Sequence, residues 1–166
     1  MKPRLLVVQI SAAVFAFSLD RLTKVWVLEN LRDVTVMPFI NGVMQLRLTA
    51  NTGMAWSLGH NNATLMTVVA SLVTIGLIAW SIRGHKLHPD SFILEKIGAG
   101  LMMGGALGNL FDRFTIGQVT DFLQTTFIDF PIFNGADSCI VIGMTLVLID
   151  QLRNSKEPTT AADSDA

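Results

Sequence analysis

Long apolar stretches without a charged residue recur along the chain. One of them, residues 63–82, has 20 residues, which is the length that a helix needs to cross the apolar core of a bilayer. Shorter stretches of this kind cover residues 5–19, 97–111 and 138–149. The pattern predicts an all-α membrane protein with four transmembrane helices, at about residues 5–28, 63–82, 93–111 and 137–152 of one polytopic membrane domain, residues 1–153.

The composition agrees with this pattern. Hydrophobic residues make up 51% and charged residues 15% of the 166-residue chain, whereas an average soluble domain carries about 25% charged residues. So few charges exclude a soluble globule and a disordered chain. The net charge of −1 offers no attraction for nucleic acid. A single cysteine and the lack of a Cys/His pattern predict neither a disulfide nor a metal site.

Positive charges lie mostly on one side of the four predicted helices, and short cytoplasmic loops of membrane proteins are rich in Lys and Arg. We therefore expect both termini to be cytoplasmic, with residues 154–166 as a disordered cytoplasmic tail. The first apolar stretch also resembles a cleavable signal peptide, but three later spans argue against that interpretation. The residues on the predicted cytoplasmic side are Lys2, Arg4, Arg83, Lys86, Lys96, Arg153 and Lys156.

The loop after the first predicted helix contains a β-hairpin pattern. An apolar run leads into Asn41 and Gly42, a strong signal for a tight turn. Apolar and polar residues alternate beyond the turn, with Met44, Leu46 and Leu48 on one face. We expect a small extracytoplasmic β-hairpin or cradle within a β-rich segment at about residues 34–56, either as a structural lid or in contact with a substrate.

The predicted helix directions bring many polar residues to the outer edge of the membrane. Ionisable groups at that depth cost a few kcal/mol each, so they usually pair or line a wet cavity. The residues expected there are Asp20, Lys24, Asn51, Asn109, Asp112, Arg113, Asp121, Asn134 and Asp137.

Several of these residues also have purely structural explanations. Asp20 and Lys24 are four residues apart and could form a plain interfacial ion pair. Asp137 alone could be the N-cap of the fourth helix. Glycines spaced four apart, among them Gly104 and Gly108, predict close packing of a neighbouring helix.

Taken together, the clustered carboxylates favour amide hydrolysis. Of two neighbouring aspartates, the ionised one can take a proton from water while the protonated one polarises the scissile carbonyl. Spacing alone does not select Asp121 over Asp112 or Asp129 as a member of the pair.

Five segments in this order resemble the lipoprotein signal peptidases (signal peptidase II), a family of bacterial aspartyl membrane proteases. The resemblance covers roughly residues 5–152, and five blocks in a four-span chain of this length make it highly specific. The segments are residues 20–24 (DRLTK), 51–56 (NTGMAW), 104–113 (GGALGNLFDR), 117–122 (GQVTDF) and 133–137 (FNGAD).

The resemblance implies that Asp121 and Asp137 are the catalytic pair. Other matched positions are implied to order the site or bind substrate, and small residues among them to let backbones approach closely. These positions are Asn51, Asn109, Arg113, Asn134, Asp20, Lys24, Gly53, Ala55, Gly104, Gly108 and Ala136.

The same resemblance implies a function. The chain would be an endopeptidase that removes signal peptides from diacylglyceryl-modified prolipoproteins, cutting just before the lipidated cysteine. It would act as a monomer in the bacterial cytoplasmic (inner) membrane, in contact with membrane lipid, with its active site at the extracytoplasmic face. No metal or organic cofactor is implied, and cyclic peptide antibiotics such as globomycin would inhibit it.

Two other functions fit the polar cluster less well. A small transporter or proton-conducting protein would place polar groups near the bilayer midplane, often in repeats, whereas this cluster is expected at one face. A non-catalytic membrane scaffold would tolerate replacement of both aspartates.

Overall fold

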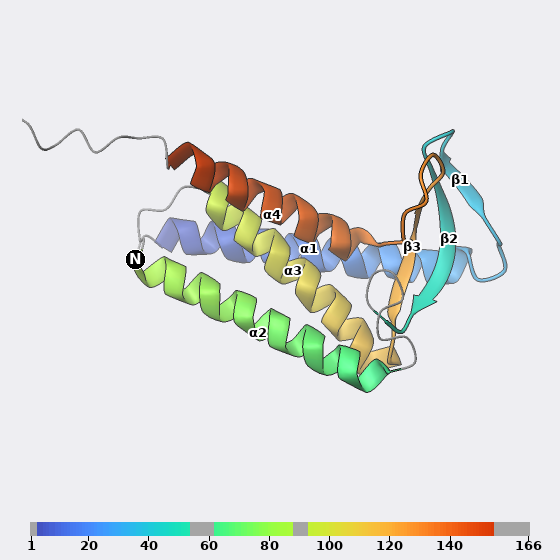
Figure 1. The fold of residues 1–166 in the computed structure, drawn as a ribbon, viewed down its shortest axis with the longest axis horizontal. Coiled ribbons are helices and arrows are strands. Elements are labelled where there is room, and N and C mark those ends of the chain that lie inside the picture. The colour runs from blue at the N-terminus through green and yellow to red at the C-terminus, as the bar shows by residue number, and fades with distance from the viewer. Residues whose placement is uncertain (1–2, 54–61, 88–92, 155–166) are drawn as a thin grey trace, which may run out of the picture.

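The structure is a computed structural model that describes residues 3–53, 62–87 and 93–154. Helices dominate it, and a small sheet lies at one end of the helical bundle (Figure 1). In chain order, the elements are α1 (Pro3–Asn30), β1 (Met37–Ile40), β2 (Met44–Asn51), α2 (Ala63–Leu87), α3 (Ile93–Ile116), β3 (Val119–Thr125) and α4 (Gly135–Asn154).

The helices run alternately toward the sheet and away from it (Figure 1). Helices α1 and α3 end near the sheet, whereas α2 and α4 begin there. The start of α1 and the end of α4 therefore lie together at the far end of the bundle. Each predicted span falls inside one of these helices, although every helix extends beyond the predicted bounds.

Three of the helices are long and apolar enough to cross a membrane, over Arg4–Asn30, Ala63–Gly84 and Gly135–Arg153. Helix α3 has 24 residues, but it does not meet the same criteria of length and composition. It packs against the three other helices, and most of its buried residues are glycines or charged residues. The prediction of membrane helices is confirmed for three segments, and the fourth span stays a prediction.

Glycines bring α3 close to its neighbours, as the spacing predicted. A Cβ atom on Gly104 would collide with the Ala13 carbonyl and the Ala16 side chain of α1. On another face of α3, a Cβ atom on Gly105 would lie 2.5 Å from the carbonyl oxygen of Ala136 in α4. Only residues without a side chain allow both helices to approach this closely.

The sheet has three antiparallel strands in the order β1-β2-β3. The predicted hairpin is present, and its turn contains Gly42 at φ 73°, a left-handed conformation that glycine adopts readily. Strand β3 was not predicted. Its pairing with β2 sets Asp121 opposite Thr49, and Asn51 opposite Val119. The sheet covers the end of α1 through a small apolar core of Val27, Leu31, Leu46 and Phe122.

Candidate active site

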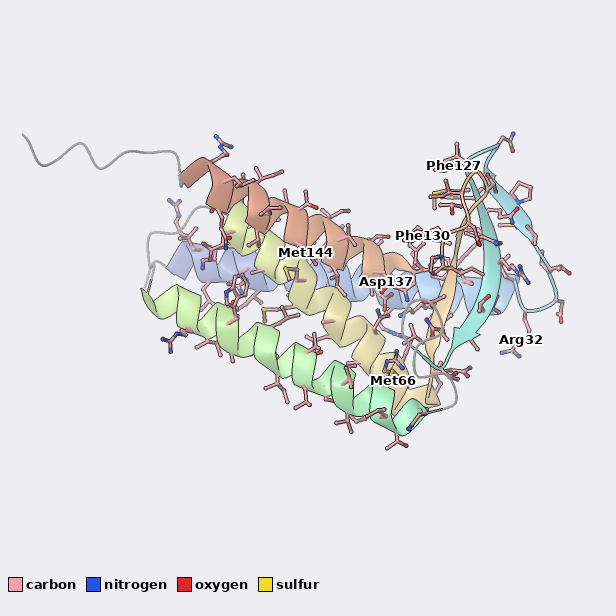
Figure 2. All side chains as sticks on the ribbon, in the orientation of Figure 1. Arg32, Met66, Phe127, Phe130, Asp137 and Met144 are labelled. Atoms are coloured by element: carbon pink, nitrogen blue, oxygen red, sulfur yellow. The ribbon has the colours of Figure 1, made fainter. Side chains whose placement is uncertain are left out.

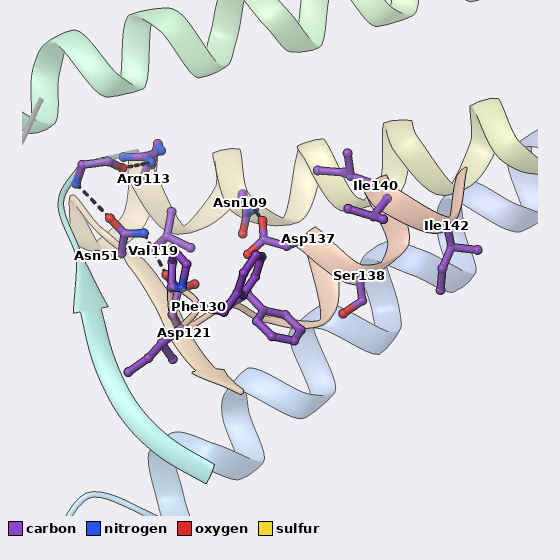
Figure 3. A pocket seen from close by; sticks show the side chains of 15 residues that line it. Asn51, Asn109, Arg113, Val119, Asp121, Phe130, Asp137, Ser138, Ile140 and Ile142 are labelled. Carbon is purple, nitrogen blue, oxygen red and sulfur yellow. Dashed lines mark hydrogen bonds between the residues drawn. The ribbon is translucent and has the colours of Figure 1, made fainter. Parts of the chain in front are cut away.

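A cavity of about 670 Å³ opens where the sheet meets the ends of α3 and α4. One wall carries polar side chains that come from four different elements (Figure 3). Apolar residues from β3, from the loop before α4 and from α4 itself line the rest of it. The polar lining is Asn51, Asn109, Arg113, Asp121, Asp137 and Ser138, and the apolar lining includes Val119, Phe130, Pro131, Ile132, Phe133, Ile140, Val141 and Ile142.

Asp121 lies in β3 and is only 2% exposed. Both of its carboxylate oxygens accept hydrogen bonds from asparagine side chains. Asn51 Nδ2 donates to Oδ2 at 2.8 Å, and Asn134 Nδ2 donates to Oδ1 at 2.6 Å. The side chain is therefore fixed by two neutral donors, one from β2 and one from the residue that precedes α4.

Asp137 lies in the first turn of α4 and takes part in a reciprocal cap. Asn134 Oδ1 accepts a hydrogen bond from the Asp137 backbone N–H at 3.0 Å, and Asp137 Oδ2 accepts one from the Asn134 backbone N–H at 3.2 Å. This arrangement is a capping box with Asn134 at the N-cap. The other oxygen, Oδ1, accepts a hydrogen bond from Asn109 Nδ2 at 2.8 Å. Asp137 thus belongs to the cap of α4 and also faces the cavity (Figures 2 and 3).

Asn109 and Asn134 connect the two aspartates. Asn134 Nδ2 donates to Asn109 Oδ1 at 3.0 Å as well as to Asp121. Asp121 and Asp137 are therefore linked through a continuous chain of side-chain hydrogen bonds. The structure brings together Asp121, Asp137 and the three asparagines that the sequence had suggested.

The pKa of Asp121 is raised from its ordinary value of 3.8 to about 6. Burial is the main cause, and the nearby charge of Asp137 acts in the same direction. The hydrogen bonds from Asn51 and Asn134 act in the opposite direction, since they favour the ionised form. A carboxyl group of this kind can carry a proton close to neutral pH.

Behind the asparagines lies a buried group of charged side chains. The Lys24 ammonium is 0% exposed and contacts Asp20 Oδ2 at 2.9 Å, Asp112 Oδ2 at 2.9 Å and Asn109 Oδ1 at 3.0 Å. Asp20 Oδ1 in turn accepts a hydrogen bond from the Ala136 backbone N–H at 3.1 Å, at the start of α4. Asp20 and Lys24 are therefore not a plain pair at an exposed interface but part of the packing behind the site.

Arg113 lies at the end of α3, beside the cavity. Its Nη2 donates to the Gly53 carbonyl oxygen at 2.8 Å. Its Nη1 is buried, and no atom of the described residues accepts a hydrogen bond from it. A guanidinium nitrogen in this position is available to an acceptor group on a bound substrate.

The predicted small residues mostly lie at close contacts. Gly53 accepts the bond from Arg113, and Ala136 is completely buried. A Cβ atom on Gly108 would lie 2.5 Å from Asp20 Oδ2, and Gly104 faces α1 as described above. Ala55 lies outside the described residues.

Asp112 was expected in the polar cluster but was given no role in the site, yet it joins the buried charges to the sheet. Its Oδ2 accepts a hydrogen bond from the Thr120 backbone N–H at 3.1 Å, one residue before Asp121. Its Oδ1 pairs with Arg21. The spacing of Asn109 and Asp112, three residues apart on one helix, was the available signal. The apolar wall formed by Phe130 and its neighbours carried no comparable signal.

Within the described residues, no group of three or more His, Cys, Asp or Glu side chains is arranged to hold a metal ion.

Comparison with known proteins identifies the family. Residues 12–153 match the family model for signal peptidase (SPase) II. The lipoprotein signal peptidase of Gloeobacter violaceus is 43% identical over 151 residues, covering 90% of this chain and 85% of the relative. That of Nostoc punctiforme is 37% identical over 154 residues, covering 93% of this chain and 94% of the relative.

A solved structure of a bacterial membrane enzyme has the same fold. It superimposes with a TM-score of 0.75 at 27% sequence identity, and the match covers 95% of this chain and 93% of that one. The family match, the relatives and the fold all point to the same family. The chain belongs to the signal peptidase II family, the lipoprotein signal peptidases, and is a peptidase that removes signal peptides from prolipoproteins.

Proposed function

We propose that Asp121 and Asp137 are the catalytic pair, and that they cleave the peptide bond just before a diacylglyceryl-modified cysteine. The observation that supports this most directly is the hydrogen-bond chain from Asp121 through Asn134 and Asn109 to Asp137. Both carboxylates also line the same cavity. Membership of a peptidase family also favours this function over a transporter or a scaffold.

The proposed reaction needs one proton on the pair. The ionised carboxylate takes a proton from a water molecule, and the water oxygen attacks the scissile carbonyl carbon. The protonated carboxyl group donates a hydrogen bond to the carbonyl oxygen, where negative charge develops. The leaving amide nitrogen then receives the proton that the carboxylate took from water, as the C–N bond breaks. Two aspartates that share a proton titrate as a unit, so the proton is assigned to the pair.

The neighbouring residues are proposed to hold this pair in place. Asn51, Asn109 and Asn134 supply donors to the carboxylates, and Arg113 keeps one guanidinium nitrogen for the substrate. Behind them, Asp20 and Lys24 support the asparagines, while Gly53, Ala55, Gly104, Gly108 and Ala136 are proposed to let the backbones approach. No metal or organic cofactor takes part in the proposed reaction.

The shape of the cavity favours a lipid-modified substrate. Val141 and Ile142 line the cavity, yet both are more than half exposed on α4, a helix long and apolar enough to span a membrane. The cavity is therefore open on a surface that would face lipid. An acyl chain could remain in the outer leaflet while the peptide bond reaches the aspartates.

The proposed topology has four spans, with both termini in the cytoplasm and the active site at the extracytoplasmic face of the bacterial cytoplasmic membrane. The alternating helix directions support it, since four helices return the chain to its starting side (Figure 1). The end of the bundle away from the sheet also carries Arg4, Arg83, Lys96 and Arg153. We further propose that a monomer is active and that cyclic peptides such as globomycin inhibit by occupying the cavity.

The catalytic assignment is tested with Asp121→Asn and Asp137→Asn in purified, inserted protein. Both variants are expected to lose cleavage of a diacylglyceryl prolipoprotein by several orders of magnitude, because neither can complete the pair. Asp129→Asn is the matched control, because Asp129 is an exposed carboxylate on the loop between β3 and α4 and does not line the cavity. Cleavage retained by either site variant would remove that residue from the pair.

A further inference from the structure

The Lys24 ammonium group has an acceptor for each of its donors. Its ammonium group has three donors and no acceptor, and three oxygens surround it: those of Asp20, Asp112 and Asn109. Because the group is completely buried, water does not compete for these donors. Asp20 and Asp112 continue to backbone N–H groups, those of Ala136 and Thr120. Of the three partners, only Asn109 donates a hydrogen bond to a carboxylate of the proposed catalytic pair.

Asn109 transmits this contact with a fixed polarity. A carboxamide presents an acceptor at one end and a donor at the other. Asn109 Oδ1 accepts from Lys24 Nζ and from Asn134 Nδ2, each at 3.0 Å. Its Nδ2 is therefore the end that meets Asp137 Oδ1, at 2.8 Å. The reversed amide would set an oxygen against the Asp137 carboxylate and its NH₂ group against two donors.

We propose that Lys24 is a positioning residue, which acts on Asp137 through the Asn109 carboxamide. The cation holds the amide in the orientation that offers a donor to Asp137. It also polarises the amide, and hydrogen bonds in such a chain strengthen one another. This inference rests on the proposed catalytic pair, because it assigns Lys24 a role only in relation to Asp137.

A simpler role for Lys24 would be to neutralise Asp20 and Asp112 and so join α1 to α3. The two roles differ in what they predict for Asn109. If Lys24 acts through Asn109, its replacement has little further effect once the amide is absent. If it only joins the helices, the two replacements act independently and their effects multiply.

The test is a double-mutant cycle on cleavage of a diacylglyceryl prolipoprotein, with Lys24→Met, Asn109→Leu and the double variant. In the wild-type background, Lys24→Met is expected to lower kcat on the order of 100-fold, as loss of one preorganised donor does, with KM changed less than about 3-fold. In the Asn109→Leu background, Lys24→Met is expected to lower kcat less than about 3-fold. Losses that multiply across the cycle would overturn the inference.

Arg21→Met is the matched control. Arg21 is a second cation paired with Asp112, and its guanidinium lies 4.5 Å from the centre of the Phe111 ring. It has no hydrogen bond to Asn109 among the described contacts. Its effect on kcat is expected to be small and to multiply with that of Asn109→Leu. Coupling of Arg21 to Asn109 as strong as that of Lys24 would also overturn the inference.

Removal of Lys24 leaves two buried carboxylates without their cation, which can prevent folding. The same cycle is therefore run in an Asp20→Asn background, where one of those charges is absent, and the same coupling is expected. The proposed function fails separately. Cleavage by Asp137→Asn would overturn the catalytic pair, whereas an inactive Asp137→Asn with multiplying losses in the cycle would overturn only the role of Lys24.

Discussion

Asp121 is an acid held by neutral donors in a place from which water is largely excluded. Its oxygens accept hydrogen bonds from Asn51 and Asn134, and no cation contacts it directly among the described residues. Burial therefore outweighs the hydrogen bonds, and the pKa of Asp121 rises to about 6. Burying this carboxylate lowers the stability of the folded protein at neutral pH, where the group is mostly ionised. This is an energetic cost of the site.

That cost has a predicted pH dependence. Between the unfolded pKa of 3.8 and the folded pKa of about 6, the folded protein binds more protons at Asp121 than the unfolded chain does. The free energy of unfolding therefore falls as pH rises through this window, by about 3 kcal/mol from this group. Measured against Asp121→Asn, wild type should lose stability between pH 4 and pH 7 in equilibrium unfolding in detergent micelles. An equal difference between the two proteins at both pH values would contradict this account.

At the scale of single residues, the sequence alone could predict which polar side chains gather but not which pair reacts. Asp112, Asp121 and Asp129 were equivalent by spacing, and only the resemblance selected Asp121. The structure separates them by environment, since Asp112 is paired with two cations, Asp129 is exposed, and Asp121 faces Asp137 through two asparagines. Such differences depend on contacts between residues distant in the sequence, which no local pattern encodes.

The start of α4 combines a helix cap and a proposed catalytic residue in one turn of helix. Helix N-termini leave backbone N–H groups without partners inside the helix. Here Asn134 accepts from the Asp137 N–H, and Asp20 accepts from the Ala136 N–H. The structural reading of Asp137 as part of a cap and its proposed catalytic role are therefore both compatible with the same geometry.

We expect Asn134→Ala to affect stability and activity together. Loss of the N-cap should cost about 1 kcal/mol, and loss of the donor to Asp121 should lower kcat on the order of 100-fold. Asn62→Ala is the control, because Asn62 caps α2 through a 3.1 Å bond from the Leu65 N–H and lies outside the hydrogen-bond chain of the site. It should cost a similar amount of stability in thermal unfolding while leaving kcat unchanged. Equal activity of the two variants would argue against the role of Asn134.

Helices α1 and α3 pack closely against each other. Because Gly104 has no side chain, α1 lies against α3 at the depth where Asp20 and Lys24 can reach Asn109 and Asp112. The spacing of the glycines predicted this approach, and the structure identifies α1 as the neighbour.

Gly104→Ala should therefore destabilise the bundle by about 1–3 kcal/mol, since the added methyl group overpacks the contact with Ala13 and Ala16. Gly76→Ala in α2 is the matched control, because a Cβ atom there meets no atom within 4 Å. Thermal unfolding in one detergent should show a lower Tm for the first variant and no decrease for the second. A Tm for Gly104→Ala that equals or exceeds the Tm for Gly76→Ala would contradict the packing account.

Two of the three strands of the sheet could be predicted from the sequence, and the third could not. The first two strands were predictable because a local turn at Asn41 and Gly42 joins them. Strand β3 follows α3 directly and pairs with β2 across about seventy residues of sequence. Because no short turn joins the two strands, the sequence contains no turn motif that predicts β3. Its most important residue, Asp121, consequently had no predicted secondary structure.

Across the whole molecule, the alternating helices and the distribution of charge support the proposed orientation in the membrane. The order and approximate positions of the four helices were predictable from hydrophobicity, because a bilayer requires long apolar segments. The composition of α3 supports a span less strongly, since its glycines and charged residues serve contacts inside the bundle.

The orientation is tested by labelling introduced cysteines with a maleimide that does not cross membranes. The natural Cys139 is buried, so it gives a low background. Arg47→Cys on the exposed side of β2 should react in intact cells after outer-membrane permeabilisation, whereas Arg153→Cys at the end of α4 should react only when the cytoplasmic membrane is also opened. Labelling of both from the same side would contradict the four-span topology.

The two aspartates are proposed to cut before a lipidated cysteine. The most direct measurement is the intact mass of the products when wild type and Asp137→Asn are each incubated with one prolipoprotein, with and without its diacylglyceryl group. We predict a single product from wild type that begins at the lipidated cysteine, and no product from the variant or from the unmodified substrate. Cleavage at another bond, equal cleavage of the unmodified substrate, or product formation by folded Asp137→Asn would contradict the account.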